Sequence, residues 1–243
     1  MLRDMDRRPH WDKLALSSLQ QDHVMDKEQL NLTGRLPLLL LGAGGHSKVV
    51  AEIALQSPEF DLLGLIDQQP AGSLVNGIAV VGTDHELASF FAKGVRNIHV
   101  AIGNNARRAA LAEMAVELNF RLATLISPAA TISRTAKIGD GVVVMGGATL
   151  NANCSVGDLT IINTGANVDH DCTIGRAVHI APGCTLAGNV TVGDRTFLGA
   201  AATVIPGVTL GSDVIVGAGA CVIRDVPSGQ TVVGVPAKVK KSR

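Results

Sequence analysis

The sequence predicts two folds within one chain: an α/β domain with a small parallel sheet, followed by an all-β solenoid. The solenoid prediction depends on a period of six residues that runs without interruption from Ala130 to Asp225. The α/β prediction depends on short aliphatic runs that alternate with helical segments earlier in the chain. With 243 residues, the chain is long enough for both parts.

Within the period of six, the third residue of every block is aliphatic through sixteen consecutive blocks. The residue two places earlier is small or slim, as at Ala148 and Ala166. Gly, Asn and Asp fill the block ends, where the chain must turn. One turn of such a coil cannot bury its aliphatic face alone, so we expect the turns to stack. The aliphatic positions are Ile132, Ile138, Val144, Leu150, Val156, Ile162, Val168, Ile174, Ile180, Leu186, Val192, Leu198, Val204, Leu210, Val216 and Val222.

The elements of the α/β domain follow from its aliphatic runs. Leu38–Leu41 is purely aliphatic, which is typical of a strand buried on both faces. Strands that alternate with helices predict a parallel sheet flanked by helices, a Rossmann-like arrangement. Further strands are expected at Leu62–Ile66, Ile78–Val81, Ile98–Ile102 and Leu122–Ile126, with helices at Val49–Gln56, from a capping Asp84 to about Lys93, and after Asn105 to about Leu118.

The chain is therefore divided into three segments. Residues 1–35 are polar, and we expect a flexible extension with a short helix around Trp11–Leu19. Residues 36–127 form the α/β domain, and residues 128–243 form the solenoid with a C-terminal tail, with Ser127 and Pro128 at the boundary.

Composition bears on partners and location. The formal net charge is zero, which gives no electrostatic support for a nucleic acid or an anionic membrane as partner. No apolar run approaches 18 residues, so no membrane span is expected. The first ten residues are charged and no apolar segment follows, so they do not form a secretory signal. We expect a cytoplasmic protein.

Three of the four cysteines, Cys154, Cys172 and Cys184, occupy the small inward position of their blocks. Cys154 and Cys172 are eighteen residues apart, and if three blocks form one coil they would lie about 4.8 Å apart on successive coils, which permits a disulfide. Reduced core thiols are the favoured interpretation for a cytosolic protein. Cys221 falls at a different, outward position, and its role stays open.

A glycine-rich turn follows the first strand, at Gly42–Lys48. Such a turn at a helix N-terminus offers backbone N–H groups and the helix dipole to an anion. Two other interpretations of this turn stay open. It could be a dinucleotide-binding turn in which Ser47 replaces the third glycine of the usual fingerprint, or a plain tight turn without a ligand. The interpretation that fits best places the phosphates of a nucleotide sugar on Gly44 and Gly45, with His46 and Ser47 donating to them.

Two more polar residues follow the ends of strands in this domain. Asp67 ends the second strand, where such folds bind a ribose hydroxyl, and Asn104 follows a third. Because ligands of open α/β sheets bind along the carboxyl edge, we expect both residues to contact the same ligand as the glycine-rich turn.

A histidine flanked by acids stands out in the solenoid. His170 occupies the fifth place of its block, outside the inward position, between Asp169 and Asp171. A neutral imidazole there can take a proton from an amine or a hydroxyl, and Asp171 or Asp169 can orient the ring. A solvated turn histidine with acidic neighbours is the alternative.

Residues 37–240 resemble the hexapeptide-repeat sugar acyltransferases, a family that includes NeuD-like sialic acid O-acetyltransferases and PglD-like bacterial UDP-4-amino-sugar N-acetyltransferases. The resemblance lies in four motifs: Leu41–Lys48, Asn163–Cys172, Val178–Gly183 and Val232–Lys238. It implies a left-handed β-helix with three blocks per coil, a homotrimer, and acetyl-CoA as donor.

The resemblance also implies roles for individual residues. His170 matches the general base, His179 matches a histidine near the acetyl donor, and the N-terminal sheet would bind the nucleotide part of the acceptor. The acid that follows the base is often Glu in this family, whereas here it is Asp171, one methylene shorter.

With eighteen residues per coil, Gly188 lies over His170 on the next coil and could donate its N–H to a thioester oxyanion. Asn163 and His179, sixteen residues apart, should share one face on successive coils and contact the substrates there. His179 and His170 are expected on different walls, distant within one subunit, so that they meet only across a subunit interface.

The function these features favour is acetyl transfer from acetyl-CoA to the amino group of a nucleotide-activated sugar, for bacterial surface glycan synthesis. The alternative within the class is an O-acetyltransferase acting on sialic acid or another sugar hydroxyl. A non-catalytic β-helix protein or a metal-dependent hydratase is the alternative from another class. A hydratase of this fold needs three zinc histidines, so no metal is expected.

Overall fold

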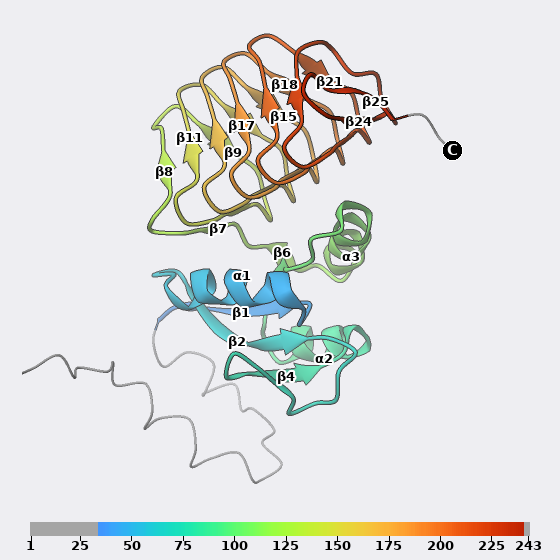
Figure 1. Cartoon of the computed structure of the whole chain (residues 1–243). Coiled ribbons are helices and arrows are strands. Elements are labelled where there is room, and N and C mark those ends of the chain that lie inside the picture. Colours follow the sequence, from blue (N-terminus) through green and yellow to red (C-terminus); the bar gives the residue numbers. More distant parts are fainter. Residues whose placement is uncertain (1–33, 241–243) are drawn as a thin grey trace, which may run out of the picture.

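The computed structural model describes residues 34–240. An α/β domain lies along one side of a β-helix, and the coils of the β-helix stack away from it in a regular series (Figure 1). The fold class predicted from the sequence is confirmed, with the β-helix left-handed. The helix predicted around Trp11–Leu19 and nearly all of the extension lie outside the described residues.

The sheet of the α/β domain contains six strands in the order β3-β4-β2-β1-β5-β6. The strands are β1 (Leu36–Leu41), β2 (Phe60–Ile66), β3 (Leu74–Val75), β4 (Ile78–Gly82), β5 (Asn97–Val100) and β6 (Arg121–Leu122). All neighbours are parallel except β3, which pairs antiparallel with β4 in a hairpin that the sequence analysis did not predict. β1 lies between β2 and β5, and Leu38 to Leu41 are almost completely buried, as expected for a strand covered on both faces.

Helices cover both faces of this sheet. α1 (Gly45–Leu55) packs through Val50 and Ala54 between the sheet and the first coils of the β-helix. α2 (Leu87–Ala92) and α3 (Asn105–Glu117) share the core of the opposite face. The fully buried core residues of α3 are alanines, Leu111 and Met114 pack against them, and the same core includes Leu159 and Ala177 of the β-helix.

The start of the α2 region differs from the prediction. Asp84 was expected to cap the helix, but it opens a short 3₁₀ turn, Asp84–Glu86, and Thr83 is the cap. The Glu86 carboxylate accepts the Thr83 backbone N–H at 2.8 Å, which completes a capping box. The glutamate three residues after the threonine stabilises this cap, and Asp84 is left free to bond elsewhere.

The predicted strand Leu122–Ile126 is two strands in the structure. β6 joins the α/β sheet beside β5, whereas β7 (Leu125–Ile126) pairs with β10 (Val143–Val144) in the β-helix. Between them, the Thr124 hydroxyl donates to the Gly139 carbonyl at 2.8 Å, which holds the chain where it crosses from one sheet to the other. β-helix pairing therefore begins at Leu125, shortly before Pro128.

Each coil of the β-helix contributes one short strand to each of three walls, and partners are eighteen residues apart, as in Val144 with Ile162. The first wall continues from β7 and β10 through β13 (Ile161–Ile162), β16 (His179–Ile180), β19 (Phe197–Leu198), β22 (Ile215–Val216), β24 (Thr231–Val233) and β25 (Lys238–Val239). The second contains β8 (Thr131–Ile132), β11 (Thr149–Leu150), β14 (Asn167–Val168), β17 (Thr185–Leu186), β20 (Thr203–Val204) and β23 (Cys221–Val222). The third contains β9 (Lys137–Ile138), β12 (Ser155–Val156), β15 (Thr173–Ile174), β18 (Thr191–Val192) and β21 (Thr209–Leu210).

The predicted inward residues form one continuous core through the β-helix. From Val144 to Val222 they are buried, and only Ile132 and Ile138, on the first coil, are partly exposed. The four cysteines are free, as favoured from the sequence. Burial raises the pKa of the Cys172 thiol to about 11, and Cys221 is half-buried on β23.

A buried arginine on α3 joins the two domains. Arg108 is 1 % exposed, and its guanidinium donates to the carbonyls of Leu159 at 2.6 Å and Ala177 at 2.9 Å on the β-helix. It also donates to Ile102 O and to the side chain of Asn105 in its own domain. Because carbonyl groups of both domains bind one buried guanidinium, the position of the α/β domain relative to the β-helix is closely defined.

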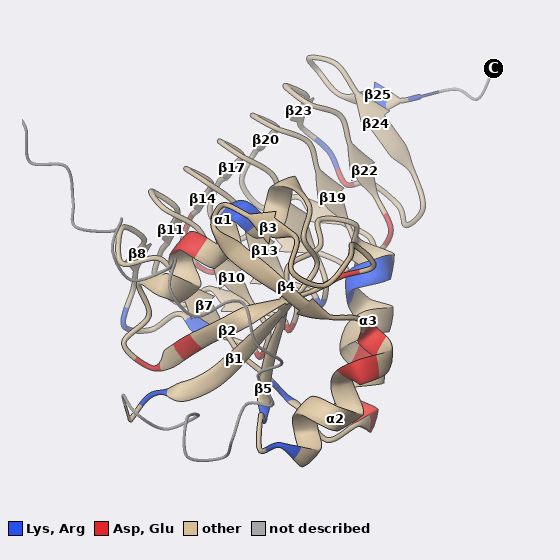
Figure 2. Ribbon diagram, turned by 90° about the horizontal axis from the view of Figure 1, so that it is seen from below, with Lys and Arg blue, Asp and Glu red and all other residues tan. Residues whose placement is uncertain are grey.

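Charged residues elsewhere are mixed in sign. In the view from below, α3 has its basic residues near its start and its acidic residues further along (Figure 2). Within residues 34–240, no helix has both the length and the apolar character needed to cross a membrane.

Candidate active site

His170 lies on a corner of the β-helix, in the turn between β14 and β15. Its Nδ1 is 2.8 Å from Oδ2 of Asp171, so the shorter acid does reach the ring. Asp171 has φ of +60°, a left-handed conformation that Asp tolerates better than most residues. The side chains of His170 and Asp171 are 59 % and 51 % exposed, so the pair is open to a ligand from outside.

Electrostatics at this corner favour the charged imidazole. The hydrogen bond that the His170 ring donates to Asp171 raises the pKa of His170 above its usual value, and the negative charge of Asp169 adds to the effect. The same bond, together with one from Asn153, lowers the pKa of Asp171. With Nδ1–H donated to the carboxylate, Nε2 keeps its lone pair, and Nε2 makes no hydrogen bond to any residue between 34 and 240. The pair therefore has the arrangement of a general base with an orienting acid.

Gly188 lies directly against the His170 ring, as the coil length predicted. A β-carbon at this glycine would lie 2.5 Å from Cε1 and 2.6 Å from Nε2 of the ring. Only a residue without a side chain leaves room for the imidazole in this position. The ring in turn covers Gly188, which is buried, and its N–H makes no hydrogen bond within the described part of the chain.

His179 lies elsewhere, on β16 of the wall that faces the α/β domain. It is buried at 9 % exposure, with Nδ1 3.1 Å from the carbonyl of Gly103 and Nε2 3.0 Å from the amide nitrogen of Asn163. The expectation that Asn163 and His179 share a face is met. Burial lowers the pKa of His179 to about 4, so the ring is neutral, with its proton on Nδ1.

The structure thus brings the predicted residues of the β-helix together in two groups. His170, Asp171 and Gly188 meet at the exposed corner. Asn163 and His179 meet at the junction with the α/β domain, where the ring of His46 lies 6.0 Å from that of His179. As expected, the two histidines of the β-helix belong to different parts of its surface.

The glycine-rich turn contains two kinds of glycine. Gly42 has φ of +113°, and a β-carbon there would lie 2.9 Å from Ile102 Cγ1, so the fold itself requires this glycine. Gly44 has an extended backbone, and neither Gly44 nor Gly45 would bring a β-carbon within 4 Å of another residue. Both are exposed at the N-terminus of α1, where their small size leaves the backbone accessible.

The other two residues of this turn are largely enclosed. Ser47 is fully buried, and its hydroxyl donates to the Gly44 carbonyl at 2.7 Å. It therefore holds the turn, and the expected donation from Ser47 to a phosphate does not fit this geometry. His46 is partly exposed, but its Nε2 is buried without a partner among the described residues, and burial lowers its pKa to about 4.

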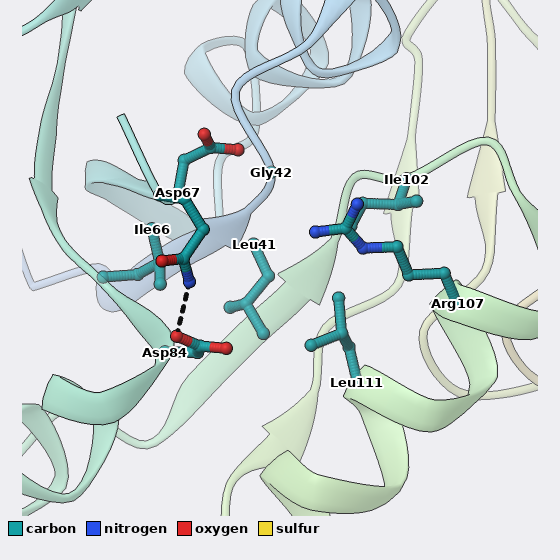
Figure 3. Close-up of a pocket in the computed structure, with 9 residues that line it drawn as sticks. Leu41, Gly42, Ile66, Asp67, Asp84, Ile102, Arg107 and Leu111 are labelled. Carbon is teal, nitrogen blue, oxygen red and sulfur yellow. Dashed lines mark hydrogen bonds between the residues drawn. The ribbon is translucent and has the colours of Figure 1, made fainter. Parts of the chain in front are cut away.

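A small, open pocket lies at the carboxyl edge of the sheet, beside Gly42 (Figure 3). Asp67 lines it, as predicted, but its carboxylate already accepts the backbone N–H groups of Ala43 at 2.9 Å and Gln69 at 3.1 Å. Asp67 thus ties the glycine-rich turn to the end of β2. Asn104 is the N-cap of α3 and lines a neighbouring groove with Arg195 rather than this pocket.

Sequence reasoning missed three polar residues of the pocket. Gln68 donates to Asp84 at 2.8 Å on one side, and Arg107 extends from α3 on the other (Figure 3). Within residues 34–240, the guanidinium of Arg107 makes no hydrogen bond or ion pair to the protein. Its place in the first turn of the helix after β5 was the feature that could have indicated it.

No group of three His, Cys, Asp or Glu side chains within the described residues has the arrangement needed to hold a metal ion.

An α/β domain with an open pocket, joined to a left-handed β-helix with a histidine–carboxylate pair, defines an acyltransferase of the hexapeptide-repeat class. Comparison with family models agrees: the PglD N-terminal domain matches residues 37–115, and the bacterial transferase hexapeptide model matches residues 171–205. The hexapeptide repeat of succinyl-transferase matches residues 189–224.

Solved structures narrow the class further. PerB from Caulobacter crescentus, in complex with CoA and GDP-perosamine, is 46 % identical with a TM-score of 0.81, over 84 % of this chain and 97 % of that one. The acetyltransferase domain of PglB from Neisseria gonorrhoeae, in complex with acetyl coenzyme A, is 42 % identical with a TM-score of 0.81, over 85 % and 100 %. WeeI from Acinetobacter baumannii is 28 % identical with a TM-score of 0.76, over 84 % and 100 %. No curated protein matches the chain. The chain belongs to the hexapeptide-repeat sugar acyltransferase family.

Proposed function

We propose that this chain transfers the acetyl group of acetyl-CoA to the amino group of a nucleotide-linked amino sugar. The observation that carries the proposal is the His170–Asp171 pair, which leaves Nε2 of an exposed imidazole available to accept a proton. PerB, which was solved with CoA and GDP-perosamine, supports an amino sugar on a nucleoside diphosphate as acceptor.

The proposed reaction is direct. Nε2 of His170 accepts a proton from the sugar amine as the amine nitrogen attacks the thioester carbonyl carbon. The C–N bond forms, negative charge develops on the carbonyl oxygen, and the C–S bond then breaks as the carbonyl double bond re-forms. The imidazolium of His170 returns its proton to the departing sulfur, so that CoA leaves as its thiol and the base is restored. Asp171 keeps the imidazole oriented and stabilises it while it carries the proton.

The N–H of Gly188 is a backbone donor beside the base that can support the developing oxyanion. No step needs a covalent enzyme intermediate. Cys154, Cys172 and Cys184 are buried, and burial raises the pKa of each thiol, which makes them poor nucleophiles.

The nucleoside end of the acceptor would occupy the pocket of Asp67 and Arg107. The phosphates would lie on the exposed backbone of Gly44 and Gly45, at the positive end of α1. The guanidinium of Arg107, which has no protein partner among residues 34–240, supplies a positive charge on the opposite side of the pocket. His46 lies at the inner end of the glycine-rich turn and would face the ligand from there.

Assembly and location belong to the same proposal. His170 is more than half exposed in one chain, and His179 lies on another wall, so a second subunit is needed to enclose the acetyl donor. We infer a homotrimer in the cytoplasm, where acetyl-CoA is available, with no nucleic acid, membrane or metal involved.

The test is an acetylation assay with acetyl-CoA and a panel of acceptors that includes GDP- and UDP-linked amino sugars and free sialic acid. We expect release of the CoA thiol and an amide product with a nucleotide-linked amino sugar. His170→Ala should lower kcat by roughly 10²–10⁴, the usual contribution of a general base, with an unchanged melting temperature. An ester product from sialic acid, or full activity in His170→Ala, would overturn the proposal.

A further inference from the structure

The corner that carries His170 contains a column of polar side chains that the proposed reaction has not yet used. Thr135, Asn153 and Asp171 occupy the same place on three successive coils, eighteen residues apart. The Asn153 backbone N–H donates to the Thr135 hydroxyl at 2.9 Å, and its side-chain amide donates to Oδ1 of Asp171 at 3.1 Å. The column therefore ends on the acid that holds His170.

The two oxygens of Asp171 have different partners. Oδ2 accepts the His170 ring N–H at 2.8 Å, whereas Oδ1 accepts the amide of Asn153. A carboxylate on an exposed turn that is held by one donor can rotate about its last torsion, whereas two donors in different directions fix its plane. Asn153 therefore determines where Oδ2 lies, and Oδ2 determines which way the imidazole faces.

Backbone conformation alone does not explain an asparagine at this position. Asn153 has φ of +60°, which Asn tolerates well. However, the same left-handed conformation is occupied on other corners by Leu159, Ala177 and Ala201. A corner turn of this solenoid thus accepts many residue types, and what distinguishes Asn153 is its contact with Asp171.

We propose that Asn153 is a positioning residue for the acetyl transfer. It fixes the Asp171 carboxylate and, through it, keeps the proton of His170 on Nδ1 so that Nε2 is the base. This inference rests on the proposed function, in which His170 accepts the proton. A second asparagine acts in parallel, because Asn151 donates to Asp169 at 2.9 Å and Asp169 accepts the His170 backbone N–H at 2.8 Å.

Two variants separate this role from a structural one. Asn153→Gly removes the amide and relieves the left-handed backbone, so it should fold. Asn153→Asp keeps the shape but replaces the donor with a second carboxylate beside Asp171. The measurement is the pH profile of kcat/KM, whose acidic limb reports the pKa of the base in the free enzyme.

The two variants should move the acidic limb in opposite directions. In Asn153→Gly, the looser Asp171 stabilises the imidazolium less, so the pKa of His170 falls and the limb moves to lower pH. In Asn153→Asp, an added negative charge stabilises the imidazolium more, so the limb moves to higher pH. In both, kcat should fall by about 10-fold, at the low end of what partners of a functional side chain contribute.

The matched control is Asn119→Gly. Asn119 also has a left-handed backbone, with φ of +67°, but it lies at the end of α3, far along the chain from the corner that carries His170. It should keep the wild-type profile and kcat. If His170→Ala loses activity while both Asn153 variants keep the wild-type limb and kcat, the positioning role is wrong and the proposed function stands. If His170→Ala remains fully active, the proposed function itself is wrong. If Asn153→Gly has a lower melting temperature, the test depends on Asn153→Asp. The acidic limb of its pH profile of kcat/KM must then still move to higher pH.

Discussion

At the scale of single residues, two glycines of the β-helix are required for different reasons. A β-carbon on Gly188 would meet the His170 ring, which is an exposed side chain that can swing away. A β-carbon on Gly193 would lie 2.5 Å from the Ser212 backbone nitrogen and 2.6 Å from the Gly211 carbonyl carbon, neither of which can move without the coil. The first glycine therefore serves the site, and the second serves the fold.

We expect Gly188→Ala to displace the His170 ring and lower kcat by about 10-fold or more, with little change in the melting temperature. Gly193→Ala should instead lower the free energy of unfolding by about 1–3 kcal/mol, the usual cost of forcing an atom into a packed interior. Steady-state kinetics and chemical denaturation of both variants provide the check. Equal loss of stability in the two would contradict this division of roles.

At the scale of elements, the turn between β1 and α1 contains one glycine that the fold requires and two that the fold does not require. Gly42 adopts a positive φ against Ile102, which lets the chain leave the strand sharply. Gly44 and Gly45 then open α1, and no other residue lies within 4 Å of a β-carbon added to either, so α1 would tolerate side chains at both places. The proposed acceptor, whose phosphates would approach the backbone here, gives a reason for glycines that the fold itself does not require.

Gly44→Val is expected to raise the KM for the nucleotide sugar by roughly 10-fold or more, because its side chain would fill the space above the helix N-terminus. The KM for acetyl-CoA and the melting temperature should stay near their wild-type values. Gly42→Val provides the contrast, since its side chain collides with Ile102 and should lower the melting temperature. An unaltered acceptor KM in Gly44→Val, or tight binding of NAD, would contradict an acceptor site at this turn.

At the scale of the whole molecule, adjacent arginines on α3 have opposite roles. Arg108 is buried and holds carbonyls of both domains, and burial lowers its pKa to about 10, which leaves it charged at neutral pH. Arg107 extends into the pocket without a protein partner among residues 34–240. One helix thus fixes the junction of the domains and also presents a cation to the pocket that we propose for the acceptor.

Replacing each arginine with alanine should separate these roles. Arg108→Ala leaves several buried carbonyls without a donor and should lower the free energy of unfolding by on the order of 3 kcal/mol. Arg107→Ala should leave stability unchanged and raise the acceptor KM, because it removes only the free charge. Denaturation curves and acceptor titrations of the two variants make the comparison. Loss of stability in Arg107→Ala would show that its side chain has a structural partner in solution.

The repeat allowed much of the β-helix to be derived from the sequence. A period of six leaves each coil one way to bury its aliphatic side chain, so the core from Val144 to Val222 could be named residue by residue. The coil length of eighteen residues, which the family resemblance implied, also predicted that Gly188 lies on His170. The period of six in the sequence therefore determined the core of the β-helix. Together with the resemblance it also determined the walls, the exposed histidine and the neighbours of that histidine along the corner.

Only the tertiary structure decided how the two domains meet and what their junction does to side chains. Ser47 is buried behind its turn, His179 is enclosed by Gly103 and Asn163, and Arg107 enters the pocket while Arg108 does not. These outcomes depend on contacts between segments as much as 76 residues apart, such as Gly103 with His179. No local period or spacing encodes such contacts, because they follow from how the sheet, α1, α3 and the first wall of the β-helix pack against one another.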